Sequence, residues 1–422
     1  MTYLMILSSV PNTYIGGKYL TLPFCFLLSE ISSFNQYYGI LYRSRVLLIT
    51  GLTLLATFAL FVNSPHYNQS VDGFFRLVNK ELIGKYFFLL YGFICALNIK
   101  SWKVLLNVTF CSLAFITIIG VINLALRHAH FVDIAMQGAV LNDITADMGG
   151  KYEYQDRFRV QATFQNPFNY GFICVLNLFI FMYAKTKKQI TKKQYYIALA
   201  CSLFGIVFCG CRTVVLVAAM TFLIYLMLTQ NLSKKLKYFV IILVVSQLTY
   251  EFVNPVRNLV DNTLTVFQRN QYATGGGSSI EMRQLQYLTV LTYTRNNMLF
   301  GRGMDFYRED LGWKNGRSGR VDEDLQGLEG VLMSYLLERG IVGIFFYLTF
   351  IGLVFFSIWK LRKIDYLTSS LAVSLLSAYF LFANMTGELD SFRSSFLLIG
   401  AAWGILFKHG NILRMRKNLK QY

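Results

Sequence analysis

The sequence is poor in charged residues, proline and histidine. The shortages of charge and histidine limit the classes of protein to which it can belong. Charged residues make up 15% of its 422 positions, whereas an ordinary soluble chain carries about 25%. The four histidines form no HxxxH pair, and the carboxylates show no metal-ligand spacing, so neither a metal site nor a cofactor is expected. A P-loop and a GxGxxG turn are both missing, which argues against the nucleotide-binding enzymes that use them. The seven cysteines lie in or beside apolar runs and are expected to be small core residues; a Cys209–Cys211 disulfide is disfavoured by its spacing.

Apolar residues, by contrast, fill 55% of the chain. They form runs long enough to cross the roughly 30 Å of a hydrocarbon layer. The expected fold is an all-α polytopic membrane protein with 11 or 12 transmembrane helices and short helices in a large outer loop. The predicted spans are 19–36, 46–63, 82–99, 104–126, 168–184, 195–210, 213–229, 237–252, 341–359, 366–384 and 394–407, with residues 1–16 as a further short span. No cleavable signal peptide is expected.

Lysine and arginine are concentrated in alternate connections between these spans. Those connections hold 20 cations and one carboxylate, Asp365, whereas the rest of the chain holds 20 cations and 21 carboxylates. The cations are Arg43, Arg45, Lys100, Lys103, Lys185, Lys187, Lys188, Lys192, Lys193, Lys234, Lys235, Lys237, Lys360, Arg362, Lys363, Lys408, Arg414, Arg416, Lys417 and Lys420. The positive-inside rule assigns them to the cytoplasm. The net charge of +18 thus reflects topology, and no nucleic-acid partner is expected.

This orientation divides the chain into four parts. Residues 1–250 are expected to be membrane helices with an outward loop near 127–167, and residues 251–329 form a large extracytoplasmic loop. Residues 330–407 are C-terminal membrane helices, followed by a basic cytoplasmic tail at 408–422. The chain is therefore expected to span a membrane many times, with a site that faces outward.

The loop 251–329 is unusual because eight of its nine cations are arginines, balanced by a similar number of carboxylates. Guanidinium groups favour bidentate contacts with phosphate or carboxylate. Leucine and aromatic spacing predicts a helix over 280–291, after a flexible Gly-Ser break at 274–279, and residues 301–328 are expected to be irregular. Gly330 to Leu337 is expected to be a short interfacial helix, with the chain turning into the bilayer at Gly340 and Gly343.

Three residues stand out as candidates for chemistry. Arg212 falls in a tight outward connection between two spans, where a buried cation is costly unless it is paired; the alternative is an interfacial anchor. Arg283 lies on the predicted loop helix, where a solvated charge is the alternative. Glu329 stands alone where the polar loop meets an apolar helix. Desolvation there would favour the protonated carboxyl and suit a general base, and a helix-start carboxylate is the alternative.

Four segments, taken in order, resemble the O-antigen polymerase (Wzy) and O-antigen ligase superfamily of membrane glycosyltransferases. The resemblance covers roughly residues 155 to 360. Its segments are Phe164-Gln-Asn-Pro167 and its continuation to Gly171, Cys211-Arg212-Thr213, Arg283 followed by Met298-Leu-Phe-Gly-Arg-Gly303, and Glu329 through Gly343. Where the ligases place a histidine this chain has Glu329, so the resemblance favours a polymerase.

The resemblance implies a location in the bacterial cytoplasmic (inner) membrane, a reaction and a set of partners. The donor would be a glycan on undecaprenyl diphosphate in the membrane lipid, and the acceptor a sugar hydroxyl, with a polysaccharide chain-length regulator as a partner protein. Arg212 and Arg283 would hold the diphosphate without a metal, while Glu329 would accept the proton in an inverting displacement. The further substrate-binding candidates are Arg159, Arg302 and Tyr335.

Two alternatives remain open from the sequence. The first is a ligase that transfers the glycan to lipid A core or to a protein. The second is a flippase or other transporter of lipid-linked oligosaccharide, which would need charges or cavities near the membrane midplane, and the predicted spans hold few charges.

Overall fold

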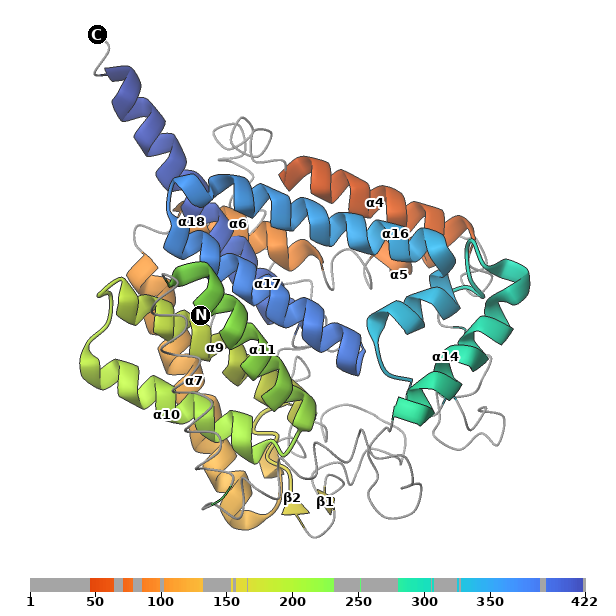
Figure 1. The fold of residues 1–422 in the computed structure, drawn as a ribbon, viewed down its shortest axis with the longest axis horizontal. Coiled ribbons are helices and arrows are strands. Elements are labelled where there is room, and N and C mark those ends of the chain that lie inside the picture. The colour runs from red at the N-terminus through yellow and green to blue at the C-terminus, as the bar shows by residue number, and fades with distance from the viewer. Residues whose placement is uncertain are drawn as a thin grey trace.

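The computed structural model describes residues 46–63, 71–78, 86–98, 102–131, 153–154, 157–164, 166–230, 251, 280–304, 306, 325, 328–387 and 392–419. Over these ranges the fold is almost entirely helical (Figure 1). The helices are α4 (Val46–Val62), α5 (Val71–Leu77), α6 (Phe87–Asn98), α7 (Trp102–Leu126), α9 (Pro167–Thr186), α10 (Lys192–Phe208), α11 (Arg212–Thr229), α14 (Ile280–Thr294), α16 (Val331–Lys360), α17 (Tyr366–Thr386) and α18 (Phe392–Leu419), with 3-10 turns η5 (Arg295–Asn297) and η8 (Leu361–Lys363). Two-residue strands β1 (Glu153–Tyr154) and β2 (Arg157–Phe158) pair antiparallel.

Five helical segments in this part of the chain are apolar and long enough to cross a membrane. They are Lys103–Leu126, Pro167–Thr186, Arg212–Thr229, Val331–Lys363 and Tyr366–Thr386. Helices α4 and α10 are apolar but have 17 residues each. All seven coincide with predicted spans, so the prediction of an α-helical membrane protein is confirmed. Predicted spans 19–36 and 237–252 lie outside the described residues apart from Glu251, and the count of 11 or 12 stays a prediction.

Helices α9 and α17 form the centre of the bundle. Fifteen of the 20 residues of α9 are buried, and its Phe172 ring stacks on Phe382 of α17 with centroids 4.3 Å apart. The buried face of α17 is built largely from small side chains, including Ser369, Ala372 and Ser374. Small residues let helix backbones approach closely, which is how interfaces pack where no water drives association.

Helix α18 packs against α6 through the spacing Gly400-Ala-Ala-Trp-Gly404. A Cβ atom on Gly400 would lie 2.1 Å from the Leu89 carbonyl oxygen, and one on Gly404 would lie 2.6 Å from the Phe93 oxygen. Larger side chains at these two positions would therefore push the two helices apart. This packing fixes α18 against the N-terminal part of the fold.

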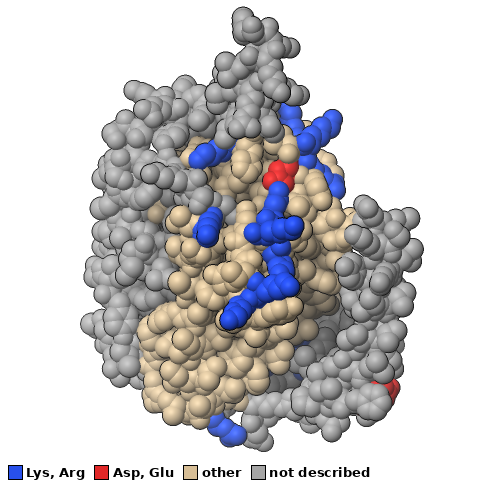
Figure 2. Space-filling model, turned by 90° about the vertical axis from the view of Figure 1, so that its left-hand side faces the viewer, with Lys and Arg blue, Asp and Glu red and all other residues tan. Residues whose placement is uncertain are grey.

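Lys187, Arg362 and Lys408 lie at one end of the bundle, the basic end. The Lys187 ammonium at the end of α9 donates to both carboxylate oxygens of Asp365, at 2.9 and 2.8 Å. Arg362 donates to the Leu228 carbonyl oxygen at the end of α11 (3.1 Å), and Lys408 donates to Leu97 O at the end of α6 (3.0 Å). Figure 2 looks onto this basic end, where lysine and arginine side chains lie across the surface.

Local predictions concern the start of α9, the turn before the span in α16 and the C-terminal tail. Asn166 caps α9, its Oδ1 accepting from the Asn169 amide at 2.8 Å, and Pro167 is the first helical residue. The sharp turn falls at Gly340, as predicted, whereas Gly343 lies inside the helix. Residues 408–419, the first part of the predicted tail, continue helix α18, which ends at Leu419.

The cysteine predictions hold in part. Cys209 and Cys211 are buried and free, and they form no disulfide. The expectation that the cysteines are core residues is wrong for Cys111, whose side chain is exposed on α7.

Candidate functional site

Arg283 and Glu329, separated by 46 residues in the chain, form an ion pair at the end of the bundle opposite to the basic end. The Arg283 Nη2 atom donates to the Glu329 Oε2 atom and also to the Met385 carbonyl oxygen at 3.3 Å. Because Met385 lies at the end of α17 and Asp365 caps its start, the 21 residues of α17 separate the two ends by about 30 Å. The structure thus brings together two of the three predicted catalytic residues.

The surroundings of Glu329 differ from the expectation. The sequence predicts a solitary carboxylate that is desolvated by apolar neighbours. Instead, its side chain is 31% exposed and paired with a guanidinium that is 35% exposed. The reason is tertiary: α14 brings a cation from the loop to the position where the polar segment joins α16. The pair remains open to a ligand that could exchange one partner for another.

Apolar packing holds α14 in this place. Val290 of α14 lies in a small buried cluster with Leu325 and with Leu336 and Leu337 of α16. The C-terminal end of α17 adds a favourable electrostatic contact, because helix C-termini attract cations. Arg283 is therefore positioned by the fold, and we do not expect it to move freely in solvent.

A backbone elbow connects α14 to α16. The helix α16 bends at Gly340 (φ 61°), and the segment after α14 lies along the bend. The amides of Ile341 and Val342 each donate at 3.0 Å, to the Met298 and Leu299 oxygens respectively. In the opposite direction, the Arg302 and Gly303 amides donate to the Leu337 and Glu338 oxygens at 2.8 and 3.0 Å.

Two glycines permit this approach. A Cβ on Gly340 would lie 2.4 Å from the Leu299 oxygen, and a Cβ on Gly301 would lie 2.6 Å from the Arg339 amide nitrogen. Both residues also have positive φ, which disfavours other residue types. Two motifs of the sequence therefore meet in one structural elbow. Its two sides are Met298–Gly303 and Glu338–Gly343, the latter being the end of the motif that begins at Glu329.

Arg212 and Arg159 lie together at a second position on the same end of the bundle. Arg212 is the first residue of α11, after the turn at Cys209 to Cys211. The Arg159 side chain lies over that turn, with its Cγ atom 3.1 Å from where a Cβ on Gly210 would be. The structure thus forms two cationic positions, Arg283 on α14 and Arg159 with Arg212 at the start of α11.

The remaining predicted substrate contacts lie at the elbow. The Arg302 guanidinium lies over the Phe306 ring, 5.7 Å from its centroid. Tyr335 is 2% exposed, and its hydroxyl is 3.4 Å from that of Tyr86 on the opposite side of a groove. Arg302 and Tyr335 therefore lie beside the ring of Phe306 and the hydroxyl of Tyr86, respectively.

Sequence reasoning missed Arg339, which is a buried cation with only 4% of its surface exposed. Its guanidinium carbon lies 3.8 Å from the centroid of the Tyr335 ring. The signal was present in the sequence, because residues four apart on a helix face each other and Tyr335 precedes Arg339 by four. A Cβ at Gly343, four residues further, would lie 2.2 Å from the Arg339 Cβ, so the glycine leaves room for this side chain.

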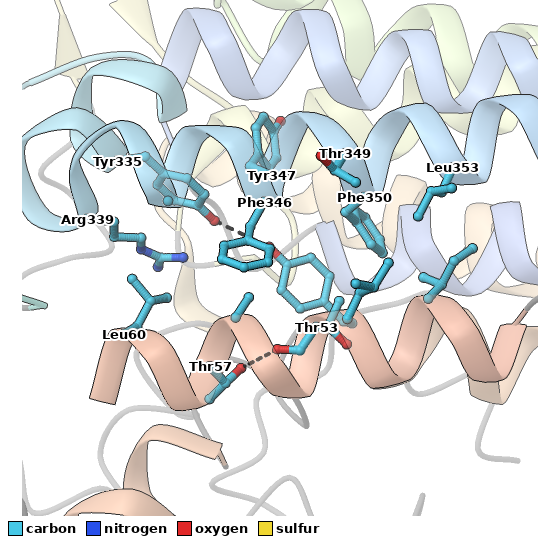
Figure 3. A pocket seen from close by; sticks show the side chains of 15 residues that line it. Thr53, Thr57, Leu60, Tyr335, Arg339, Phe346, Tyr347, Thr349, Phe350 and Leu353 are labelled. Atoms are coloured by element: carbon cyan, nitrogen blue, oxygen red, sulfur yellow. Dashed lines mark hydrogen bonds between the residues drawn. The ribbon is translucent and has the colours of Figure 1, made fainter. Parts of the chain in front are cut away.

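Arg339 faces a groove between α4 and α16 (Figure 3). Its lining residues are Ile49, Leu52, Thr53, Ala56, Thr57, Leu60, Tyr86, Tyr335, Arg339, Gly343, Phe346, Tyr347, Thr349, Phe350 and Leu353. Tyr335 and Arg339 lie at one end, and aliphatic and aromatic side chains form the body. The groove therefore combines an apolar channel with a cation at its end.

Comparison with known proteins identifies no matching family model and no matching curated sequence.

Proposed function

We propose that this protein is a membrane glycosyltransferase that polymerises repeat units of a bacterial surface polysaccharide. It would transfer a growing glycan from undecaprenyl diphosphate to the non-reducing end of a lipid-linked repeat, whether the product is O-antigen, capsule or exopolysaccharide. The observation that carries the proposal is the Arg283–Glu329 pair. It unites two motif residues at the end of the bundle opposite to the basic residues.

The orientation belongs to the proposal. If the basic end faces the cytoplasm, as the positive-inside rule expects, the pair and Arg212 face the outside of the inner membrane and the C-terminus is cytoplasmic. Lipid-linked repeats that have been moved across the membrane would meet the enzyme there. A chain-length regulator is the expected partner protein.

The ion pair suggests how the donor would activate the site. A carboxylate that accepts from a guanidinium is a poor proton acceptor for a sugar hydroxyl. A diphosphate carries more charge than one carboxylate and matches the guanidinium fork, so it would take Arg283 from Glu329. Donor binding would then release the carboxylate as the general base.

In the transfer step, the acceptor hydroxyl loses its proton to Glu329 and its oxygen bonds to the anomeric carbon of the donor sugar. The bond from that carbon to the diphosphate oxygen breaks, and the electron pair leaves with the lipid diphosphate. Arg283 would stabilise the charge that develops on this leaving group. The configuration at the anomeric carbon inverts, because the displacement is single.

Arg212 and Arg159 would support the same charge from the start of α11. The N-terminus of a helix favours anions, and two arginines beside it strengthen that preference. We expect these residues to bind the second phosphate or the first sugar of the donor. No metal or cofactor has a part in this mechanism.

A gel of the surface glycan tests the function in the source strain. With Arg212→Ala, Arg283→Ala or Glu329→Ala in place of the native protein, a polymerase would lose the ladder of long chains but retain single-repeat glycan on its acceptor. Loss of all attached glycan would instead identify a ligase, and glycan trapped on the inner side of the membrane would identify a transporter. Unchanged ladders for all three variants would reject the site assignment.

A further inference from the structure

The groove between α4 and α16 has one charged group among its lining residues, the Arg339 guanidinium. Its two threonines on α4 use their hydroxyls within the helix: Thr53 donates to the Thr50 oxygen at 2.8 Å and Thr57 donates to the Thr53 oxygen at 2.7 Å. The body of the groove therefore offers mainly apolar surface. A ligand that fits such a lining has a long apolar part and one anionic end.

The groove is long enough for a chain. A second hollow shares Ile49, Thr53, Tyr86 and Phe350 with it and continues toward α6. From Ile49 to Leu60 the lining follows about 16 Å of α4. Neighbouring side chains on the outer faces of the two helices, such as Leu55 and Phe345, are 61% and 64% exposed. Because both helices coincide with predicted spans, a lipid chain could enter the groove from the bilayer.

The cation at the end of the groove is held in place. Gly343 provides the space for its stem and the Tyr335 ring lies under its guanidinium, 3.8 Å away. Figure 3 shows Arg339 directed into the space between α16 and Leu60 of α4. A fixed guanidinium at the mouth of an apolar channel is complementary to a phosphate that bears an apolar chain.

We propose that this groove binds the single isoprenoid chain of the lipid diphosphate donor, with Arg339 on its phosphate. This inference depends on the proposed function for the identity of the lipid. It adds a place for the lipid chain and a cation, Arg339, that was not among the candidate site residues. Arg339 lies on the arm of α16 that begins at Val331, and Glu329 immediately precedes that arm, so chain binding and transfer would occur on neighbouring parts of one structural unit.

Photoaffinity labelling tests the proposal directly. The purified full-length protein is irradiated with a benzophenone analogue of farnesyl diphosphate, and the labelled peptides are mapped by mass spectrometry. We expect label on α4 and α16 residues that line the groove. Farnesyl diphosphate should displace it, farnesol should be about tenfold or more weaker, as expected for loss of a charged hydrogen bond, and inorganic pyrophosphate should not displace it.

Matched variants separate the groove from the rest of the surface. Arg339→Gln should weaken displacement by farnesyl diphosphate about tenfold or more and leave farnesol unaffected. Arg362→Gln is its control, because Arg362 also lies over an aromatic ring of α16, Trp359, at 4.6 Å, but outside the groove. Ala56→Trp should fill the groove and abolish labelling, while Leu55→Trp, on the exposed face of α4, should leave it unchanged.

Three results would overturn the proposal: label outside the groove, labelling that persists in Ala56→Trp, or displacement by dioleoyl phosphatidylglycerol as efficient as by farnesyl diphosphate. The last would assign the groove to a bilayer phospholipid. The proposed function has a separate readout, polymer formation by the wild-type protein. Polymer formation without groove labelling would reject only the groove, and groove labelling without polymer formation would reject only the polymerase.

Discussion

The two ends of the bundle each contain an ion pair between residues distant in sequence, but the two pairs are built differently. At the basic end, the Asp365 carboxylate is 12% exposed, accepts two hydrogen bonds from Lys187, and also accepts from the amide and hydroxyl of Thr368. At the opposite end, the Glu329 side chain is 31% exposed and pairs with Arg283. The two carboxylates therefore differ in exposure, and the more exposed one is within reach of a ligand from solvent.

This difference indicates different roles. Asp365 caps α17 and joins it to α9, so its charge is used for structure. The Arg283–Glu329 pair is open at the surface, where an ion pair contributes about 0–1 kcal/mol to stability. A pair that stabilises little and is positioned by packed helices is suited to exchange partners with a substrate. The following predictions test this comparison.

Replacing Arg283 should have the largest effect, and the effect should be on activity. We expect Arg283→Ala to lower polymer formation by about 10²–10³-fold, the usual cost of removing one donor to a developing anion. Thermal unfolding in detergent should change by less than about 1 kcal/mol because the pair is partly exposed. Arg295→Ala, an exposed arginine after the same helix, is the control. Equal losses in both variants would contradict a specific role.

Filling the elbow should reduce stability and activity together. In Gly340→Ala the new Cβ would meet the Leu299 oxygen at 2.4 Å in a backbone with positive φ, so we expect a loss of about 3 kcal/mol or more. Gly352→Ala is the control, since nothing lies within 4 Å of its added Cβ. Unfolding temperatures of the two purified variants check the prediction, and equal values would show that the elbow tolerates a side chain.

Removing the negative charge of Asp365 at the basic end should lower stability and leave activity unchanged. Asp365→Asn removes an acceptor for Lys187 and for the first turn of α17, so we expect a loss of about 1–3 kcal/mol in the free energy of unfolding. Polymer formation below the unfolding temperature should stay within about threefold of the wild type, a change of less than 1 kcal/mol. A selective loss of activity in a folded variant would remove the contrast between the ends.

The same carboxylate predicts a dependence on pH. Burial raises the pKa of Asp365, but the hydrogen bonds from Lys187 and Thr368 outweigh it and hold the pKa below its ordinary value of 3.8. A lowered pKa contributes stability that is fully present above 3.8 and is lost as the pH falls through the folded-state pKa. The difference in unfolding temperature between wild type and Asp365→Asn should thus be constant above pH 4 (about the ordinary carboxyl value) and shrink below it. His409 Nδ1, 3.9 Å from Asp365 Oδ2, faces the same carboxylate, and His409→Gln should leave this profile in place.

The smallest effect is expected for Arg362→Gln. Its guanidinium donates to the Leu228 oxygen and lies over Trp359, contacts that are together worth about 1 kcal/mol at a partly exposed position. Urea-induced or thermal unfolding should show a shift of this size or less. A loss as large as that of Asp365→Asn would mean that the basic end is held by many equal contacts.

Hydropathy was sufficient to predict the membrane helices, because a segment that must satisfy its backbone in lipid has to be helical and apolar along its length. The cap at Asn166 and the turn at Gly340 were also readable, since both depend on local residue types. The Arg283–Glu329 contact was not, because hydropathy says nothing about which loop helix returns to which span. The surroundings of Glu329 were predicted wrongly for that reason, because the structure pairs it with Arg283.

Arg339 shows a different limit of sequence reasoning. A single arginine inside a mostly apolar helix is usually read as part of the span's end, and its burial follows from Gly343 and from the position of α4. The burial of Arg339 therefore depends on tertiary packing that the sequence does not reveal. The glycines at 301 and 340 were recognised as a motif, but their physical reason, the contact between two backbones, required the structure.

The most direct test of the central claim compares the two carboxylates in one assay. Purified wild type, Glu329→Gln and Asp365→Asn are supplied with lipid-linked repeat units, below the unfolding temperature of every variant, and polymer formation is measured by gel and mass spectrometry. We predict that Glu329→Gln loses about 100-fold or more of the rate, whereas Asp365→Asn remains within about threefold of the wild type. Polymer formation by Glu329→Gln at the wild-type rate, or an equal loss in both variants, would contradict the assignment of chemistry to the Arg283–Glu329 end.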